Sequence, residues 1–185
     1  MTRQIVILIN SNHKKSLKEV FGRIIWFIVW KLTASWTPRF FNPWRILLLR
    51  MFGATIGKKV LVLSSVRIDI PWNLEIGDYS AIGMRVWVYN FAKVIIGSNT
   101  VISQDSVLCT SSHNYEHPHF TLYSKAILVG SQTWIAANCF VMPGISIGNG
   151  SVVGACSVVT RDIGNWKICA GNPCRPLKER IMSTI

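Results

Sequence analysis

The chain lacks several patterns by which common classes of function are recognised. Its five cysteines include no C-x-x-C pair, which argues against a disulfide framework and a zinc site and fits a reducing cytoplasm. Neither G-x4-G-K-[ST] nor G-x-S-x-G occurs, so nucleotide hydrolysis and serine-hydrolase chemistry have no support. Residues 148–154 (GNGSVVG) miss the spacing of the dinucleotide-binding fingerprint. The sequence therefore gives no motif support for a zinc protein, a nucleotide hydrolase, a serine hydrolase or a dinucleotide-binding enzyme.

Long apolar runs are also missing. Residues 5–9 are only five consecutive apolar residues, too few for the core of a signal peptide. Residues 24–30 (IIWFIVW) form the most apolar stretch, but Arg23 and Lys31 bracket it, and spanning a bilayer takes about 20 residues. We therefore expect a helix there that lies either against a membrane interface or against the protein's own core.

Acidic residues are few, and the resulting positive charge is unevenly placed. The chain has 20 Lys and Arg against 8 Asp and Glu, and residues 1–52 contain nine basic residues with Glu19 as the one acidic residue. Residues 1–53 are therefore a basic, Trp-rich segment, expected to be helical. Such a segment suits phospholipid headgroups, anionic substrates or nucleic acid, and a solvated surface is the plain alternative. Half of the chain is apolar and 15% is charged, which excludes a disordered protein.

A six-residue repeat is what the chain does contain. Fifteen aliphatic residues fall into five groups of three, spaced by six positions within each group: Ile56, Val62, Ile68; Ile76, Ile82, Val88; Ile96, Ile102, Leu108; Val129, Ile135, Val141; and Ile147, Val153, Val159. Each hexapeptide is expected to form one short strand with its aliphatic side chain inward, and a small residue usually follows at the corner. The sequence thus predicts an all-β core, a single-stranded parallel β-helix over residues 54–160.

The repeat is interrupted once, by a loop at residues 109–128. Leu108 and Val129 are 21 residues apart where six are expected, and long excursions from a rigid scaffold commonly carry function. The loop contains His113, His117 and His119, whose spacing matches no common zinc site, so we expect no metal. A neutral imidazole suits a general base, and His113 lies nearest the coil. The other two histidines are interpreted as solvated.

The repeat ends at Val159, and residues 161–185 form a C-terminal extension. Within it we expect a short basic helix over residues 177–182.

Four stretches carry a resemblance to a known family: residues 71–83, 101–120, 133–148 and 158–176. They resemble the hexapeptide-repeat acetyltransferases, which include galactoside and maltose O-acetyltransferases, and most closely the acetyltransferases assigned to colanic acid biosynthesis. The resemblance implies a left-handed coil, a homotrimer, acetyl-CoA as co-substrate and a saccharide acceptor. No nucleic-acid partner is implied.

The resemblance also implies site residues, position by position. His113 matches the catalytic base, and Asn90 matches an asparagine that contacts the acceptor or the acetyl group. Glu116 is a candidate to orient His113. The positions that match the CoA site are Trp134, Ala137, Ala155, Thr160, Arg161, Arg175 and Lys178.

The chain departs from the family's pattern in three places. Ala137 stands where Ser is frequent, and Arg161 stands where the pattern has Lys. The N-terminal sugar-binding segment of the galactoside enzymes is absent, so their acceptor contacts do not transfer to this chain.

The function expected from these residues is transfer of an acetyl group from acetyl-CoA to a sugar hydroxyl in exopolysaccharide or surface-glycan biosynthesis. The expected location is the cytoplasm, with peripheral contact through residues 1–45 to the inner face of the cytoplasmic membrane. Two alternatives stay open. One is acetylation of a small molecule such as a free sugar, serine or an antibiotic. The other is a non-catalytic scaffold or binding protein, which would have no need of His113, Arg161 and Arg175 together.

Overall fold

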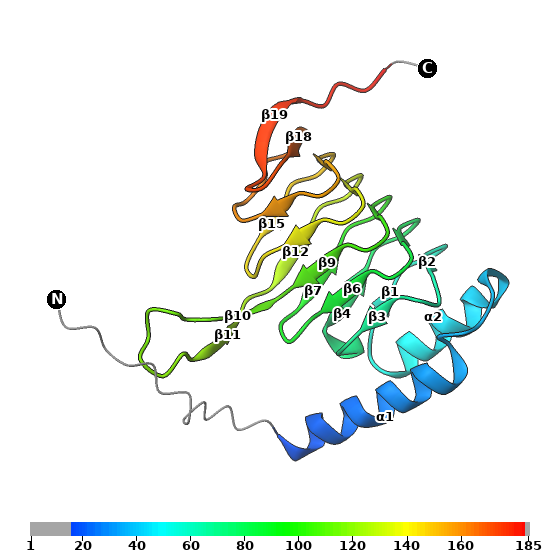
Figure 1. Cartoon of the computed structure of the whole chain (residues 1–185). Helices are drawn as coiled ribbons and strands as arrows, with labels where there is room; N and C mark the ends of the chain where they lie inside the picture. The colour runs from blue at the N-terminus through cyan, green and yellow to red at the C-terminus, as the bar shows by residue number, and fades with distance from the viewer. Residues whose placement is uncertain (1–15, 184–185) are drawn as a thin grey trace.

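The computed structural model describes residues 16–183, which wind as a parallel β-solenoid with helices at its N-terminal end (Figure 1). Each turn contributes one strand to each of three sheets. The first sheet contains β1 (Thr55–Ile56), β4 (Leu74–Ile76), β7 (Val94–Ile96), β12 (Ile127–Val129) and β15 (Ser146–Ile147). The second contains β2 (Leu61–Val62), β5 (Ala81–Ile82), β8 (Val101–Ile102), β13 (Trp134–Ile135), β16 (Val152–Val153), β18 (Lys167–Ala170) and β19 (Arg175–Glu179). The third contains β3 (Arg67–Ile68), β6 (Trp87–Tyr89), β9 (Val107–Cys109), β14 (Phe140–Val141) and β17 (Val158–Val159).

The core is made of the repeated aliphatic residues. All fifteen are buried, and the most exposed of them, Ile56, keeps only 7% of its surface accessible. Ile82, Ile102 and Ile135 show the register, because they stand opposite one another on β5, β8 and β13. Burying a side chain of this size contributes about 1.5–3 kcal/mol, so stacked turns stabilise one another where a single turn could not. The predicted parallel β-helix is confirmed.

A buried polar ladder runs beside the second sheet. The hydroxyls of four residues donate hydrogen bonds to glycine carbonyls on the next turn: Ser80 to Gly97, Thr100 to Gly130, Thr133 to Gly148 and Ser151 to Gly164. These bonds satisfy polar groups that burial would otherwise leave unpaired. The turns approach closely here, since a Cβ on Gly97 would lie 2.5 Å from the nitrogen of Ser131. The small residue at this corner is therefore a steric requirement.

The N-terminal helices lie against the first turn of the coil (Figure 1). They are α1 (Leu17–Thr33), the 3₁₀ turn η2 (Arg39–Phe41) and α2 (Asn42–Met51). The indole nitrogens of Trp26 and Trp30 donate to the carbonyls of Ile68 and Val66, at 2.7 Å and 3.2 Å. No helix within residues 16–183 is long and apolar enough to cross a membrane. The inner face of α1 therefore packs on the protein's own core, one of the two alternatives expected for residues 24–30.

Arg45 ties α2 to the coil from a fully buried position. Its Nε donates to the carbonyl of Val62 at 2.8 Å, and its Nη1 donates to the hydroxyl of Thr37 at 2.7 Å and the carbonyl of Pro38 at 3.0 Å. Burial lowers the pKa of Arg45, and a guanidinium nevertheless stays charged near neutral pH. This cation belongs to the core and is not available to a membrane or a ligand.

The interruption of the repeat forms an antiparallel hairpin. β9 ends at Cys109, β10 (Ser111–His113) pairs with β11 (Leu122–Ser124), and the coil resumes with β12. The hairpin extends away from the coil (Figure 1). A shorter insertion in the coil, between β3 and β4, forms the 3₁₀ turn η3 (Pro71–Asn73).

The predicted short helix over residues 177–182 is wrong. Arg175–Glu179 forms β19, which pairs antiparallel with β18. The reason is the open edge that β18 presents at the end of the second sheet. A short isolated helix is marginal in water, whereas a strand paired to that edge satisfies its backbone groups.

Candidate functional site

His113 is the last residue of β10, where the hairpin leaves the third sheet. Its Nδ1 lies 2.8 Å from the carbonyl oxygen of Phe120, and the two rings stack with centroids 4.4 Å apart and planes 8° from parallel. The side chain is half-buried. The hairpin thus holds the imidazole by one hydrogen bond and one ring face.

The Phe120 contact determines which nitrogen of His113 carries the proton. A carbonyl oxygen accepts hydrogen bonds and cannot donate one, so Nδ1 must be the N–H of the neutral ring. Nε2 is then an unprotonated acceptor, the form that a general base requires. The expected partner, Glu116, is exposed and forms no ion pair with His113 among residues 16–183. The orienting group is therefore the backbone at Phe120.

His117 and His119 lie at the exposed end of the hairpin. Their ring centroids are 5.5 Å apart, and His117 Nδ1 accepts a hydrogen bond from the backbone nitrogen of His119 at 3.2 Å. Within the part of the chain that the structure describes, no group of three or more His, Cys, Asp or Glu side chains is placed to hold a metal ion.

Asn90 is fully buried directly after β6. Its Oδ1 accepts from the backbone nitrogen of Ile70 at 2.9 Å, and its Nδ2 donates to the carbonyl of Ile70 at 2.6 Å. The amide thus bridges two turns of the coil, a structural task that the sequence does not reveal. Its contact with an acceptor or acetyl group stays a prediction.

Three of the predicted CoA positions lie on or beside the second sheet. Trp134 stands on the outer face of β13, 47% exposed, and its Nε1 donates to the hydroxyl of Ser103 at 2.9 Å. Ala137 and Ala155 follow β13 and β16, one turn apart, at the corner that leads to the third sheet. An exposed indole and two small side chains on or beside the same sheet are a combination that suits a pantetheine chain.

The other four predicted CoA positions are all exposed and lie in two places. Thr160 and Arg161 follow β17, at the corner where the third sheet ends. Arg175 and Lys178 lie on β19, at the end of the second sheet. Exposed guanidinium and ammonium groups at the end of the coil are suited to phosphate.

The structure separates His113 from the Trp134 surface. His113 leaves the coil after a strand of the third sheet, whereas Trp134 is on the second sheet and Ala137 is at the corner between the two. The two groups thus lie on different sides of one prism.

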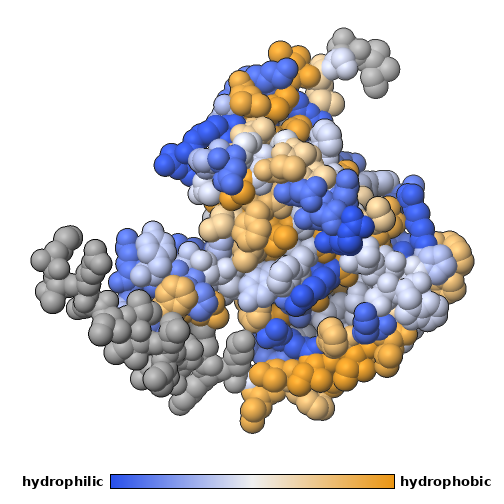
Figure 2. Space-filling view, viewed as in Figure 1, coloured by the Kyte–Doolittle hydropathy of each residue, from blue (hydrophilic) through white to orange (hydrophobic). Residues whose placement is uncertain are grey.

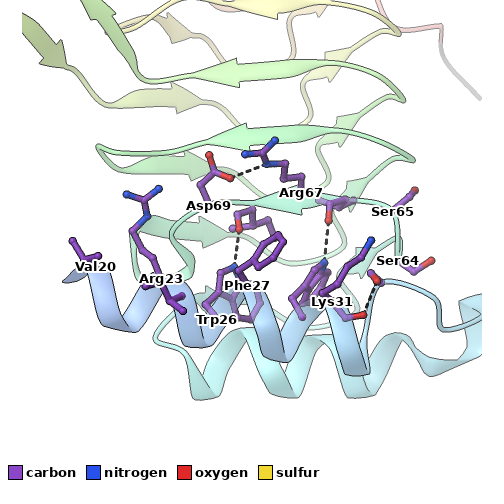
Figure 3. Close-up of a pocket in the computed structure, with 14 residues that line it drawn as sticks. Val20, Arg23, Trp26, Phe27, Lys31, Ser64, Ser65, Arg67 and Asp69 are labelled. Carbon is purple, nitrogen blue, oxygen red and sulfur yellow. Dashed lines mark hydrogen bonds and ion pairs between the residues drawn. The ribbon is translucent and has the colours of Figure 1, made fainter. Parts of the chain in front are cut away.

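Sequence reasoning missed a groove between α1 and β3, shown in Figure 3. Its volume is about 780 Å³, and Arg23, Lys31 and Arg67 are among its lining residues. The guanidinium of Arg23 lies 4.5 Å from the ring centroid of Phe91, whose ring is 4.7 Å from that of Tyr89, and burial raises the pKa of the Tyr89 phenol. Arg67 and Arg23 are 44 positions apart in the sequence, so no local pattern links them. The one available signal was the excess of positive charge in residues 1–52.

Comparison with known proteins places the chain in a family. Residues 126–161 match the family model described as "Bacterial transferase hexapeptide (six repeats)". The chain is 42% identical over 157 residues to WcaF of Escherichia coli (strain K12), provisionally named a colanic acid biosynthesis acetyltransferase, with 85% of this chain and 86% of that protein covered. The chain belongs to the hexapeptide-repeat acetyltransferase family.

Solved structures of this family have the same fold. A maltose O-acetyltransferase from Clostridium difficile 630 matches with a TM-score of 0.83 and 26% identity, over 90% of each chain. The hexapeptide-repeat acetyltransferase VCA0836 from Vibrio cholerae O1 biovar eltor, complexed with acetyl coenzyme A, matches with a TM-score of 0.81 and 23% identity, over 95% of this chain and 97% of that one. At this identity the second likeness shows the fold alone. The fold and the family expected from the residues are confirmed.

Proposed function

We propose that the protein transfers an acetyl group from acetyl-CoA to a sugar hydroxyl in the assembly of an exopolysaccharide or surface glycan. The observation that carries this proposal is His113, whose Nδ1 donates to the carbonyl of Phe120, so that Nε2 is the unprotonated ring nitrogen. The names of the colanic acid and maltose relatives support a saccharide acceptor. The acetyl-CoA complex of a structure with the same fold supports the donor.

The geometry of His113 supports direct transfer with both substrates bound together. Nε2 takes the proton of the acceptor hydroxyl while the hydroxyl oxygen attacks the carbonyl carbon of the thioester, so a C–O bond forms and the C–S bond breaks. The imidazolium then returns the proton to the departing thiolate of CoA, which leaves the ring neutral for the next cycle. Holding both substrates in one site supplies a large share of the rate enhancement. Asn90 is proposed to support this site through the turn it bridges.

The Trp134 surface is the proposed binding site for CoA. Pantetheine would lie along Ala137 and Ala155, where small side chains leave room, and the indole of Trp134 would cover it. The phosphates would meet exposed cations at the end of the coil, Arg175 and Lys178 on β19 or the Thr160–Arg161 pair of a neighbouring copy.

We propose a homotrimer as the working form. His113 and Trp134 lie on different sides of one coil, which supports a site shared between His113 of one copy and the CoA surface of its neighbour. A closed three-fold ring of copies would form three identical sites of this kind.

The proposed location is the cytoplasm, with the protein held at the inner face of the membrane. Of the expected contact segment, residues 1–45, the first fifteen lie outside the described residues. The rest carries exposed apolar side chains such as Phe21, Phe27 and Trp36 next to basic ones. Contact with an anionic leaflet fits this combination.

An acceptor screen tests the function. Purified full-length protein is incubated with acetyl-CoA and a panel of free sugars, nucleotide sugars, lipid-linked sugars, serine and an aminoglycoside, with thiol release and product mass as readouts. The proposal expects an O-acetylated saccharide. Transfer to serine or the antibiotic alone would favour the small-molecule alternative, and no thiol release with any acceptor would favour the non-catalytic one.

A further inference from the structure

The groove between α1 and β3 has one apolar wall, formed by α1 (Figure 3). Trp26 and Trp30 line it from the buried side of α1, and their hydrogen bonds to Ile68 and Val66 hold the helix against the coil. Ile24 is half-exposed, and Phe27 keeps 68% of its surface accessible. The helix is therefore apolar on the side that packs and also on the side that faces outward.

The groove is also cationic. Arg23, Lys31 and Arg67 line it, with Asp69 as the one carboxylate among its lining residues. Asp69 pairs with Arg67 at 3.0 Å, whereas Lys31 forms no ion pair with any described residue. The Nε of Arg23 is buried and has no hydrogen-bond partner within residues 16–183. Among the described residues, neither Arg23, whose guanidinium lies 4.5 Å from the Phe91 ring centroid, nor Lys31 has a carboxylate partner, which suits a phosphate or diphosphate.

The outer face of α1 continues as an apolar surface beyond the groove. Figure 2 shows it as an orange band along the edge of the molecule that Figure 1 assigns to the N-terminal helices. Its exposed side chains on α1 include Leu17, Phe21, Ile25, Ile28 and Leu32. A helix whose outer face is as apolar as its packed face is normally covered by protein or lipid, and the basic residues on and around this one complement an anionic leaflet.

The groove opens on the same sheet as the proposed catalytic base. β3 forms one wall of the groove, β6 and β9 follow it in the third sheet, and His113 leaves the coil just after β9. Two strand spacings separate the levels of β3 and β9, about 10 Å. Between them stand the indole of Trp87, under the guanidinium of Arg67 at 4.2 Å, and the ring of Tyr89. An aromatic wall therefore leads from the cations toward the base.

We propose that this groove binds the phosphate or diphosphate group that joins a saccharide to a membrane lipid. The lipid chain then lies in the bilayer against the outer face of α1, and the saccharide extends along Trp87 and Tyr89 toward His113. The inference rests on the proposed sugar O-acetylation and deepens it by naming the class of acceptor. A nucleotide sugar carries the same diphosphate, but it has no chain for the apolar face of the helix.

Vesicle binding tests the groove without requiring any acetyl transfer. Full-length protein is pelleted with phosphatidylcholine vesicles that contain or lack a few percent of a polyprenyl diphosphate. We compare the wild type, the double variant Arg23→Gln/Lys31→Gln, and the matched control Lys58→Gln/Lys59→Gln, which removes two charges from the same turn at another corner. The diphosphate lipid should strengthen wild-type and control binding on the order of tenfold and leave the groove variant unaffected. Equal binding with and without it, or no effect of the groove variant, overturns the inference.

A catalytic arm separates the two proposals. The KM of a lipid-linked saccharide should rise on the order of tenfold in Arg23→Gln/Lys31→Gln, while the KM of the same saccharide without lipid and phosphate stays within about twofold. Transfer to the free saccharide without vesicle binding refutes the groove and leaves the acetyltransferase. Vesicle binding without transfer to any acceptor supports the groove and refutes the acetyltransferase. A soluble nucleotide sugar that is acetylated as efficiently as the lipid-linked one refutes the lipid part.

The apolar face has its own control. Phe21→Ser/Leu32→Ser should weaken binding to all vesicles and leave the oligomeric state unchanged in light scattering. If it instead dissociates the protein and leaves vesicle binding intact, the face is an interface between copies of the chain, and the inference falls.

Discussion

The Nδ1 atom of His113 donates a hydrogen bond to the carbonyl oxygen of Phe120 across 2.8 Å, while the two rings stack 4.4 Å apart. One residue therefore fixes both the tautomer and the orientation of the imidazole. Phe120 holds this position with a positive φ of 47°, a conformation that non-glycine residues rarely adopt. The hairpin accepts that local strain at the residue that orients the proposed base.

Removing the Phe120 ring should impair turnover more than binding. Phe120→Ala keeps the carbonyl but loses the stacked face, so the imidazole samples more orientations. We expect kcat to fall about tenfold while the KM for acetyl-CoA stays unchanged. Phe120→Tyr should retain nearly full activity, and Tyr115→Ala, an exposed aromatic on the same loop, serves as the control. A raised KM with normal kcat would show that Phe120 contacts a substrate instead.

The buried cation of α2 should be a large contributor to stability. Arg45→Met keeps the apolar stem but leaves the carbonyls of Val62 and Pro38 and the hydroxyl of Thr37 without a donor. We expect the free energy of unfolding to fall by about 3 kcal/mol in urea titrations followed by circular dichroism. Arg39→Met, at an exposed position, should change it by less than about 0.5 kcal/mol. Similar losses in both variants would refute the structural role of Arg45.

Thiol labelling should report on the CoA surface. Cys156 is the exposed cysteine, next to Ala155, and burial raises the pKa of the other four thiols, Cys109, Cys139, Cys169 and Cys174. Those four stay protonated and shielded near pH 8, so iodoacetamide should modify Cys156 first. Acetyl-CoA should slow this modification at least about fivefold in the wild type. It should give no protection in Ala137→Trp, where the indole fills the corner. Protection that persists in that variant would place CoA elsewhere.

Mixed oligomers should recover activity if two copies build each site. His113→Ala lacks the base and Ala137→Trp lacks room for CoA, so each homogeneous protein should be inactive. When the two are co-expressed in equal amounts, about a quarter of the sites should pair an intact His113 with an intact Ala137 corner. The purified mixture should therefore show roughly a quarter of the wild-type kcat per chain. A mixture as inactive as its parents would mean that one chain supplies both groups.

The coil could be predicted from the sequence because its periodicity is local. Every inward position repeats the same chemistry at six-residue spacing, and all fifteen positions are buried. The loop that carries His113 could be predicted for the same reason, as a gap in that pattern. For residues 24–30 the sequence left two alternatives open, and it is the structure that shows Trp26 and Trp30, four apart, bonded to the coil while Phe21 and Ile28 are exposed.

Features that depend on distant partners could not be predicted. The segment after Pro173 forms a strand because β18 presents an edge to it, and nothing within residues 175–179 reveals that edge. The hydrogen bond from His113 to Phe120 depends on the hairpin register, which places a backbone carbonyl there in place of the expected Glu116. The groove joins Arg23 and Arg67 only after α1 has packed on the coil.

The most direct test of the account is the rate of acetyl transfer by His113 variants. His113→Ala and His113→Gln are compared with the wild type and with His117→Ala, which removes an exposed imidazole from the same hairpin. Thiol release from acetyl-CoA with a saccharide acceptor is measured after circular dichroism has shown that all four proteins are folded. We predict that kcat falls at least about a hundredfold in both His113 variants and less than about twofold in His117→Ala. Turnover by His113→Ala equal to that of the wild type would contradict the account.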